Sequence, residues 1–361
     1  MTVLDTSTVT EAQADSPSET ATEAALALQI ARALALREQH WYSHPLVRTD
    51  AKLPTNANLD VLGIVERAGR KQRKPVSFWA HPVTGKSFTI LLIEAFLREA
   101  YPGCGIFIYE AKGKTERPRS IRADEVRERE FFIDLLAAMS YEGRIESAVP
   151  RAREQIQKAL LAMSLPARHL FFIFDEAQEI SADEYKWMKT ILNWLARNGV
   201  QLGIFSFGQY ELLEKRDEIA AKFRSDIHAR FIGNVYELKG LQDAGEFAVP
   251  LKACDDQSEY PAGSGLTYTA FLFPLAHANG FRFESLATRL WDAFMKAAPL
   301  RRGESGIAMQ YFADVLSELV EILRDRDSPD MAVTDEDLMQ AISYTDYVRR
   351  EPVRERAETR Q

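Results

Sequence analysis

Short apolar runs alternate with amphipathic stretches along the middle of the chain, and this alternation constrains the fold more than any other feature. Five runs have the composition of buried strands: 75–80, 105–109, 169–176, 200–207 and 235–238. Between them, apolar residues recur at the spacing of helices with one buried face, as in 184–195. Strands that alternate with helices indicate a parallel sheet covered on both faces. We therefore predict an α/β fold with a five-stranded parallel sheet.

The chain is long enough for more than one domain. Its 361 residues, 46% of them hydrophobic, suggest two domains, because one domain commonly holds roughly 100 to 200 residues. After residue 240 the strand-like runs stop, and several helical patterns follow. The predicted divisions are a disordered acidic arm (1–20), an N-terminal helix and connector (21–58), an α/β core (59–240), a helical lid domain (241–348) and a flexible tail (349–361).

Composition and charge narrow the class of protein. With 45 Lys and Arg against 53 Asp and Glu, the net charge is −8, so any contact with nucleic acid must use a local basic stripe. The longest apolar stretches are shorter than the roughly 18 residues of a membrane span, and the acidic N-terminus lacks the basic start of a signal peptide. Cys104 and Cys254 have neither the number nor the spacing of a disulfide framework or a zinc site. We expect a cytoplasmic protein without membrane contact, with both cysteines as buried apolar residues.

A loop with the composition of a phosphate-binding site follows the first predicted strand. It reads Ala80-His81-Pro82-Val83-Thr84-Gly85-Lys86-Ser87, and an apolar helix begins at Phe88. Backbone N–H groups at a helix start point at an anion, Lys86 can reach the terminal phosphates of ATP, and Ser87 can hold Mg²⁺. The predicted nucleotide contacts are therefore His81, Pro82, Val83, Thr84, Gly85, Lys86, Ser87 and Phe88.

The loop departs from the usual pattern G-x-x-x-x-G-K-[ST] at its first position, which is Ala80. Ala tolerates a positive φ poorly, and Pro82 lacks an N–H group. These two features leave weak nucleotide binding open. An ordinary polar turn between a strand and a helix is the alternative interpretation of the whole loop.

Two adjacent carboxylates, Asp175 and Glu176, end the third predicted strand. Carboxylates at the mouth of a buried strand are costly to desolvate unless a metal ion or a proton is at hand. We predict that Asp175 belongs to the Mg²⁺ shell and that Glu176 orients and polarises the water that attacks the γ-phosphate. An isolated Asp-Glu pair is usually a solvated helix start, so this prediction depends on the phosphate loop upstream.

Four segments, taken in order, resemble the TniB/TnsC branch of AAA+ ATPases, which regulate DNA transposition. They are HPVTGKS at 81–87, FFIFDEAQEIS at 171–181, GIFSFGQYEL at 203–212 and NGFRFESLATRLW at 279–291. The similarity covers about residues 45 to 300, and related ExeA-type secretion ATPases share much of it. The resemblance implies a P-loop AAA+ core with a C-terminal helical lid domain and a slow ATPase activity.

The resemblance also implies roles for residues outside the two motifs. It places the γ-phosphate sensor at Gln209, with Ser206 as the second choice. Arg224 and Arg230 match the arginine that one subunit offers to the site of the next, where a guanidinium stabilises transition-state charge. Arg282 matches the lid arginine that folds back on the nucleotide. The alternatives are an ordinary turn residue for the sensor, surface salt bridges for Arg224 and Arg230, and no role for Arg282.

Two basic clusters are candidates for DNA contacts. Lys112, Lys114, Arg117 and Arg119 follow the second predicted strand and are suited to phosphate contacts that do not read sequence. The resemblance places this region in the pore of a ring around duplex DNA, and a solvated charge run is the alternative. The second cluster, residues 67–74, is ambiguous between nucleotide, DNA and no ligand.

A short aromatic segment lies near the predicted connector. His40 and His44 flank Trp41 and Tyr42, where the family often carries the aromatic residue that packs near adenine. Metal binding there would need further ligands that the sequence does not offer, so we expect packing.

The resemblance as a whole implies an ATP-dependent, DNA-binding regulator of transposition with ATP and Mg²⁺ as cofactors. Such a protein forms a homo-oligomeric ring or filament on duplex DNA and links a TniQ/TnsD-like target-selection protein to the transposase. Two alternatives remain open. One is a non-hydrolysing scaffold, which Ala80 and Pro82 favour. The other is an ExeA-like secretion ATPase, which would be expected to carry a membrane or cell-wall segment.

Overall fold

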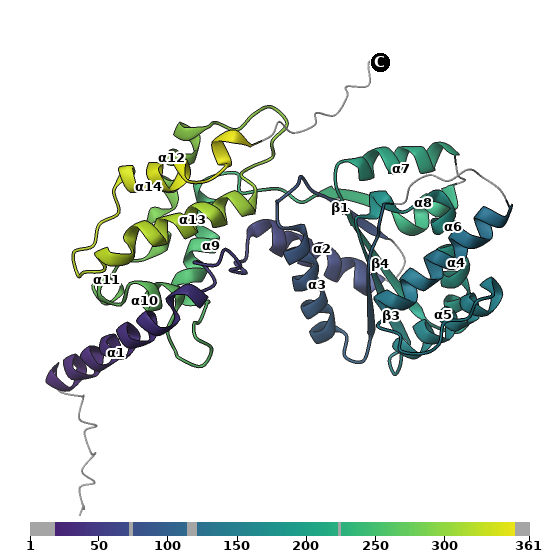
Figure 1. The fold of residues 1–361 in the computed structure, drawn as a ribbon, viewed down its shortest axis with the longest axis horizontal. Coiled ribbons are helices and arrows are strands. Elements are labelled where there is room, and N and C mark those ends of the chain that lie inside the picture. Colours follow the sequence, from purple (N-terminus) through teal and green to yellow (C-terminus); the bar gives the residue numbers. More distant parts are fainter. Residues whose placement is uncertain (1–18, 72–74, 114–120, 223–224, 351–361) are drawn as a thin grey trace, which may run out of the picture.

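The computed structural model describes residues 19–71, 75–113, 121–222 and 225–350, which form a sheet lobe and a helical lobe (Figure 1). The sheet lobe contains five strands: β1 Val76–Trp79, β2 Gly105–Glu110, β3 His169–Asp175, β4 Gln201–Gly208 and β5 Asn234–Glu237. Their order in the sheet is β2-β3-β4-β1-β5, and every pair is parallel. The predicted α/β fold with a five-stranded parallel sheet is confirmed.

Strand β3, which has a neighbour on each side, shows why this sheet needs a cover on both faces. It is buried from His169 to Phe174, and only Asp175 at its carboxyl end is partly exposed. Side chains alternate between the faces of a strand, so Phe172 packs into one core cluster of the lobe while Phe171 and Ile173 pack into the other.

Helices supply the cover on each face of the sheet. The cluster around Phe172 also contains side chains of β2 and β4, and its helical side chains come mainly from five helices: α4 Ile121–Ala138, α5 Val149–Met163, α6 Ala182–Arg197, α7 Glu211–Lys222 and α8 Ser225–Phe231. The cluster around Phe171 takes them mainly from two helices: α2 Asn56–Lys71 and α3 Lys86–Ala100. A short turn, η2 Ala177–Glu179, follows β3 at the edge where parallel strands end.

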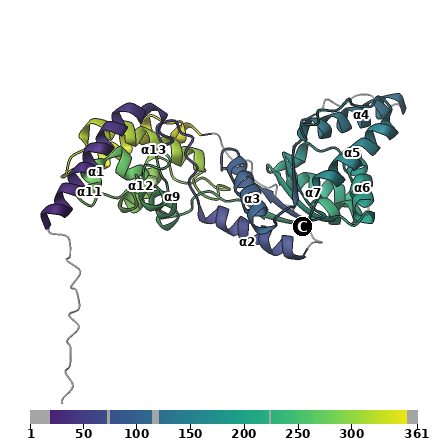
Figure 2. The same cartoon turned by 90° about the horizontal axis from the view of Figure 1, so that it is seen from below.

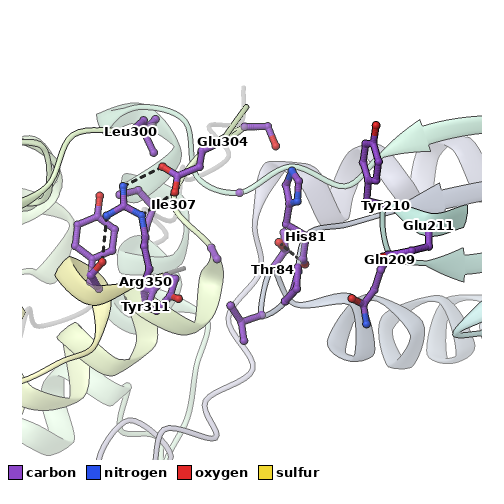
Figure 3. A pocket seen from close by; sticks show the side chains of 17 residues that line it. His81, Thr84, Gln209, Tyr210, Glu211, Leu300, Glu304, Ile307, Tyr311 and Arg350 are labelled. Atoms are coloured by element: carbon purple, nitrogen blue, oxygen red, sulfur yellow. Dashed lines mark hydrogen bonds and ion pairs between the residues drawn. The ribbon is translucent and has the colours of Figure 1, made fainter. Parts of the chain in front are cut away.

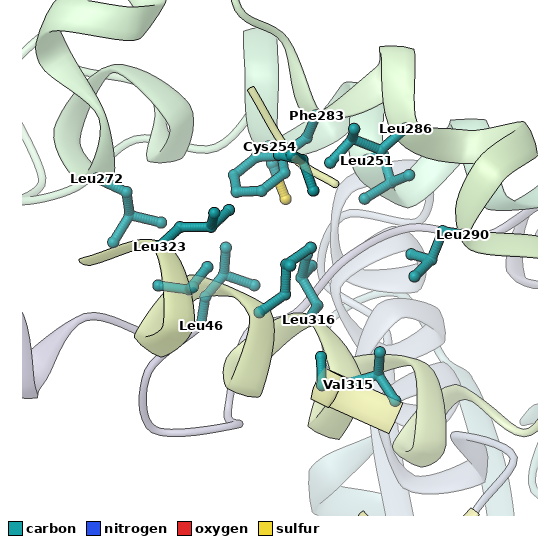
Figure 4. Packing of buried hydrophobic residues seen from close by; sticks show 14 of the residues in the cluster. Leu46, Leu251, Cys254, Leu272, Phe283, Leu286, Leu290, Val315, Leu316 and Leu323 are labelled. Atoms are coloured by element: carbon teal, nitrogen blue, oxygen red, sulfur yellow. The ribbon is translucent and has the colours of Figure 1, made fainter. Parts of the chain in front are cut away.

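The helical lobe is built around α13 Met309–Leu323, whose residues Phe312, Leu316, Leu319 and Leu323 are buried at helical spacing (Figure 4). The other elements of the lobe surround it: α9 Ala244–Asp256, α10 Tyr268–Leu272, α11 Pro274–Ala278, η3 Phe283–Leu286, α12 Ala287–Ala297, η4 Arg324–Arg326, α14 Asp335–Ser343 and η5 Tyr347–Arg349. The C-terminal part is therefore helical, as predicted.

The N-terminal segment also packs on the helical lobe, alongside its helices in both cartoon views (Figures 1 and 2). It comprises α1 Glu19–His40, η1 Trp41–Ser43 and the connector up to Leu53. Trp41, Leu46 and Leu53 are each 1% exposed and belong to the same core as α13. The apolar residues of this N-terminal segment therefore complete the core of the helical lobe.

The C-terminal end of the described chain is ordered further than predicted. The flexible tail was expected to begin at residue 349, but Arg350 is only 7% exposed and forms an ion pair with Glu304. Residues 1–18 and 351–361 lie outside the described residues, so the arm and the rest of the tail stay predictions. Among the described helices, none has both the length and the hydropathy needed to cross a membrane.

The two cysteines are free thiols in different surroundings. Cys254 is buried in the core of the helical lobe, as expected, whereas Cys104 is only partly buried beside α3. Within the described ranges, no group of three or more His, Cys, Asp or Glu residues is arranged to hold a metal ion.

Candidate active site

The loop between β1 and α3 turns sharply into the helix at a left-handed glycine. Gly85 is the N-cap of α3 and has φ 107°, a conformation that side-chain-bearing residues rarely adopt. A Cβ at this position would lie 3.6 Å from Cβ of Met309, which is an ordinary contact, so backbone conformation and not space requires glycine here. The first N–H groups of α3 have no partner within the helix and are available to an anion.

Ala80, where the usual pattern has glycine, does not have a positive φ. Its N–H donates to the carbonyl of Gly208 (3.0 Å), and its methyl group is buried in the core under α3. In the loop, positive φ occurs at Val83 (59°) and Gly85, not at Ala80. The left-handed position of a non-glycine residue in this loop therefore lies three residues after Ala80. Val83 is β-branched, and a positive φ is energetically unfavourable for β-branched residues.

Lys86 joins the loop to the acidic end of β3. Its Nζ lies 3.1 Å from Oδ1 of Asp175 and donates to Oε1 of Glu176. The three side chains are between 13% and 25% exposed, so the cluster is largely shielded from water. The structure thus brings together the amine and both carboxylates of the predicted site.

Hydrogen bonds fix both the backbone and the carboxylate of Glu176. Its backbone adopts φ 50°, and its N–H donates to Oδ1 of Asp175 (2.8 Å). Oε2 accepts hydrogen bonds from Nε2 of Gln178 (2.5 Å) and from Nε2 of Gln209 (3.4 Å). Burial alone would raise the pKa of Glu176, but the hydrogen bonds from Lys86, Gln178 and Gln209 outweigh it and lower the pKa. The carboxylate is therefore ionised at neutral pH.

A cavity of about 510 Å³ opens beside this cluster and lies within the size range of small-molecule sites. Its walls come from the loop, from the connector, from the ends of β3 and β4 and from α13: Thr49, Asp50, Ala51, Lys52, Leu53, Ala80, His81, Pro82, Val83, Gly85, Lys86, Ser87, Phe88, Leu91, Glu176, Gln209, Met309, Gln310 and Ala313. All predicted loop contacts except Thr84 are in this set.

The residues present fit a nucleoside triphosphate with Mg²⁺. The loop offers the left-handed Gly85 and the start of a helix to phosphates, and Lys86 adds a positive charge. The hydroxyl of Ser87 and the carboxylate of Asp175 are oxygen donors of the kind that Mg²⁺ prefers.

A second cavity, of about 360 Å³, lies between the two lobes and shares His81, Pro82, Val83 and Gln209 with the first (Figure 3). Thr84 lines this one, opposite Tyr311 and the Glu304–Arg350 pair of the helical lobe (Figure 3). Nε2 of His81 is buried without a hydrogen-bond partner, and burial lowers the pKa of this ring against the opposing pull of Glu237, Gly303 and Glu304.

The candidate sensors occupy different environments. Gln209 lines both cavities and reaches Glu176. Ser206 is fully buried, and its hydroxyl donates to the carbonyl of Phe231 (3.0 Å). Only Gln209 is therefore in a position to meet a ligand.

The two predicted arginines within the described residues, Arg230 and Arg282, do not join the site in this single chain. The guanidinium of Arg282 donates to the carbonyls of His277 (2.9 Å) and Phe281 (2.6 Å), and the residue lines neither cavity. Arg230 donates to Oδ1 of Asn193 (2.6 Å) on α6. Arg224 lies outside the described residues.

Of the four DNA-contact candidates, Lys112 is described and exposed, directly after β2. Lys114, Arg117 and Arg119 lie outside the described residues. In the second basic cluster, Arg70 on α2 forms an ion pair with Glu66.

The aromatic segment near the connector lies in the helical lobe, away from the cavities. Trp41 donates from Nε1 to Oε1 of Glu321 (2.8 Å). The ring of His44 stacks on Phe271 at 5.1 Å between centroids and meets the edges of Tyr260 and Tyr268. The expected packing role is confirmed, and neither residue lines the candidate nucleotide cavity.

Sequence reasoning missed two contributions to the site. The lid wall formed by Met309, Gln310 and Ala313 has no local motif, and the N–H of Gln310 donates to the carbonyl of Val83 (3.2 Å). Gln178 lies within the segment FFIFDEAQEIS, and its place two residues after Glu176 is the one signal that pointed to it.

The comparisons with known proteins bear on the fold. No family model matches the chain, and no curated protein matches it. Among solved structures, the chain is similar to the ORC2 protein of Aeropyrum pernix in its ADPNP–ADP complexes, with a TM-score of 0.54 and 11% identity over 83% of this chain and 71% of that chain. The ADP form of that protein is less similar, with a TM-score of 0.47 and 13% identity over 80% of this chain and 68% of that chain. Domain III of the Thermotoga maritima replication initiation protein DnaA has a TM-score of 0.42 and 12% identity over 82% of this chain and 95% of that chain.

At this identity the likeness shows the fold alone. The chain has an α/β fold similar to that of the ORC2 protein, with a five-stranded parallel sheet, flanking helices and a helical C-terminal part. The narrower resemblance to the TniB/TnsC branch stays a prediction.

Proposed function

We propose that this protein binds and hydrolyses ATP in the 510 Å³ cavity. One observation carries the proposal: Lys86, at the start of α3, meets Asp175 and Glu176 at the end of a buried strand, beside a cavity of nucleotide size. A cation and two carboxylates held together in this way are costly to desolvate. In a site that hydrolyses a phosphate, the cation would bind phosphate and the carboxylates would bind the metal ion and the attacking water.

Each residue of the cluster has a definite task in this proposal. The N–H groups that follow Gly85 bind the phosphates, and Lys86 leaves its carboxylate partners to reach them. Ser87 and Asp175 would hold Mg²⁺, whose charge offsets that of the phosphates. Oε1 of Glu176, released by Lys86, accepts a proton from the attacking water, and Gln209 lies close enough to orient that water.

We further propose that a nucleotide in this cavity links the two lobes and promotes assembly. The cavity wall contains both sheet-lobe and lid residues, so a bound nucleotide would join them. We propose that Arg224 or Arg230 completes the site of a neighbouring subunit and that Arg282 turns to the nucleotide in the closed form. ATP then favours the homo-oligomer, and hydrolysis loosens it.

The basic loop after β2 is the proposed contact to duplex DNA, with Lys112, Lys114, Arg117 and Arg119 as phosphate ligands. The resemblance in four segments favours a transposition regulator that links a TniQ/TnsD-like target-selection protein to a transposase. This partner assignment rests on resemblance to that family, because the fold alone does not select a biological role.

Phosphate release from purified protein tests the ATPase proposal. Wild type, Lys86→Ala and Glu176→Gln are compared with ATP and Mg²⁺, with and without duplex DNA. We expect both variants to lose activity, by roughly 100-fold or more, because each removes a group that acts in the transition state. Equal release by wild type and Glu176→Gln would instead favour the non-hydrolysing scaffold.

The DNA proposal needs a control for net charge. Neutralising Lys112, Lys114, Arg117 and Arg119 should weaken duplex binding of the ATP-loaded protein and reduce its salt dependence. The matched control neutralises four cations in ion pairs on exposed helix surfaces: Arg98, Lys158, Lys186 and Lys252. Equal loss in both variants would argue against the basic loop. Imaging with duplex DNA and a non-hydrolysable ATP analogue should reveal rings or filaments.

A further inference from the structure

Gln178 lies in η2 and bridges the ends of two neighbouring strands. Its Nε2 donates to Oε2 of Glu176 at 2.5 Å, just after β3. Its Oε1 accepts the backbone N–H of Gln209 at 3.1 Å, just after β4. The half-buried side chain of Gln178 thus connects the carboxylate of Glu176 with the backbone of Gln209, whose own side chain also reaches Glu176.

Both ends of the amide are matched to their partners. If the amide were turned over, its oxygen would face the Glu176 carboxylate and its NH₂ group would face an N–H donor, so only the observed orientation satisfies both neighbours. Gly208 leaves the room for it, because a Cβ at this position would lie 2.6 Å from Oε1 of Gln178. The bridge therefore has a fixed direction and a fixed place.

The two oxygens of Glu176 consequently have different partners. Oε1 is bonded to Lys86, whereas Oε2 is bonded to Gln178 and Gln209. When Lys86 turns to phosphate, Oε1 becomes free to accept a proton, and Oε2 keeps both amide donors. The amides then hold the carboxylate plane, so Oε1 does not have to search for the water.

We infer that Gln178 is the positioning residue for Glu176 and ties its carboxylate to the end of β4. The inference rests on the proposed ATPase function and adds a residue to it. Because Gln178 acts through Glu176 and not on the nucleotide, its loss should lower kcat while leaving nucleotide affinity nearly unchanged.

Three variants test this inference in the full-length chain. Gln178→Met keeps the side-chain length and removes both hydrogen bonds, and Gln178→Glu keeps the acceptor for Gln209 but replaces the donor to Glu176. Gly208→Ala displaces the amide from the opposite side and covers the case in which a change at residue 178 prevents folding. The control is Gln201→Glu, an exposed glutamine at the other end of β4.

We expect each of the three variants to lower kcat by roughly 10- to 100-fold, with the dissociation constant for ADP changed less than about threefold. The control should match wild type. In a double-mutant cycle, Gln178→Met should change the residual rate of Glu176→Gln by less than about twofold, because the group that it positions is already gone.

The possible failures are distinct. A wild type that releases no phosphate overturns the proposed function and this inference with it. An active wild type with equally active Gln178→Met overturns the inference alone. Independent losses from Gln178→Met and Glu176→Gln, or a parallel loss of ADP affinity, would show that Gln178 acts on something other than Glu176.

Discussion

Lys86 and Glu176 are 90 positions apart in the chain, yet the ammonium of one donates to the carboxylate of the other. The amine that a phosphate would need is therefore engaged by the group that would activate water. Binding of a triphosphate has to break this ion pair before the two side chains can take up their separate tasks.

This competition predicts the effect of Glu176→Gln on binding. The variant removes one of the two negative charges that hold Lys86 and leaves Asp175 in place. ATP should therefore bind roughly two- to tenfold more tightly while hydrolysis is lost, in line with a net difference of about 1 kcal/mol for one hydrogen bond. Titration with a fluorescent ATP analogue measures the affinity. Weaker binding by the variant would mean that Glu176 helps to hold the nucleotide.

Gly85→Ala should weaken nucleotide binding without unfolding the protein. The added methyl group has space, but φ 107° costs a residue with a side chain roughly 1–2 kcal/mol or more, so the loop should relax to another conformation. We expect at least a tenfold loss of affinity for ADP. The control is Gly265→Ala, at φ 74° with nothing within 4 Å of its added Cβ, which should lose stability but not affinity. Similar affinities in both variants would contradict the proposed phosphate site.

His44 should make the helical lobe sensitive to acid. Burial lowers its pKa from 6.5 to about 3, so the unfolded chain binds a proton that the folded chain excludes. Stability from this group is full above about pH 6.5 and falls by up to about 1.4 kcal/mol for each pH unit between 6.5 and 3.

The comparison that isolates this effect is His44→Phe, which keeps an aromatic ring but removes the acceptor for the N–H of Leu46. Denaturation with urea from pH 7 to pH 4 should show a shallower loss of stability than in wild type. His40→Phe should retain the wild-type slope, because His44 is still present. An unchanged slope in His44→Phe would place the acid sensitivity elsewhere.

The Glu304–Arg350 pair should be costly to break from one side. Its two hydrogen bonds are both 2.9 Å, and the side chains are 5% and 6% exposed. Arg350→Met leaves a buried carboxylate without its counter-charge and should destabilise the lobe by about 3 kcal/mol. The double variant with Glu304→Leu should recover much of this loss.

Urea denaturation, monitored by tryptophan fluorescence, checks this prediction. The matched control is Arg289→Met in the same lobe, whose partner Asp335 is 81% exposed, and it should cost less than about 1 kcal/mol. Equal losses in Arg350→Met and Arg289→Met would mean that burial does not set the strength of the pair.

Local patterns predicted the elements of the site well. Each of these patterns depends on a few adjacent residues: the apolar runs of strand length, the Gly-Lys-Ser turn and the Asp-Glu pair. The runs form the sheet, and the turn and the acidic pair meet at the edge where its strands end. The parallel arrangement makes this outcome predictable, because carboxyl ends of parallel strands meet at the same edge.

Relations between distant segments were not predictable in this way. Gln178 is one polar residue in an acidic turn until its contacts with Glu176 and Gln209 are known. Ala80 departs from a motif, but only the backbone shows that the left-handed position is Val83. Trp41 and His44 form an aromatic segment whose partners are lid residues more than 200 positions away.

The amino-acid sequence alone determined the five strands, the phosphate-type loop and the acidic strand end, because hydrophobic period and turn chemistry act over a few residues. The tertiary structure decided which side chains face one another: Lys86 on Glu176, Gln178 between β3 and β4, and the N-terminal segment in the core of the lid. Such contacts depend on how packed helices and strands are oriented relative to one another. A local sequence pattern carries little information about this relative orientation.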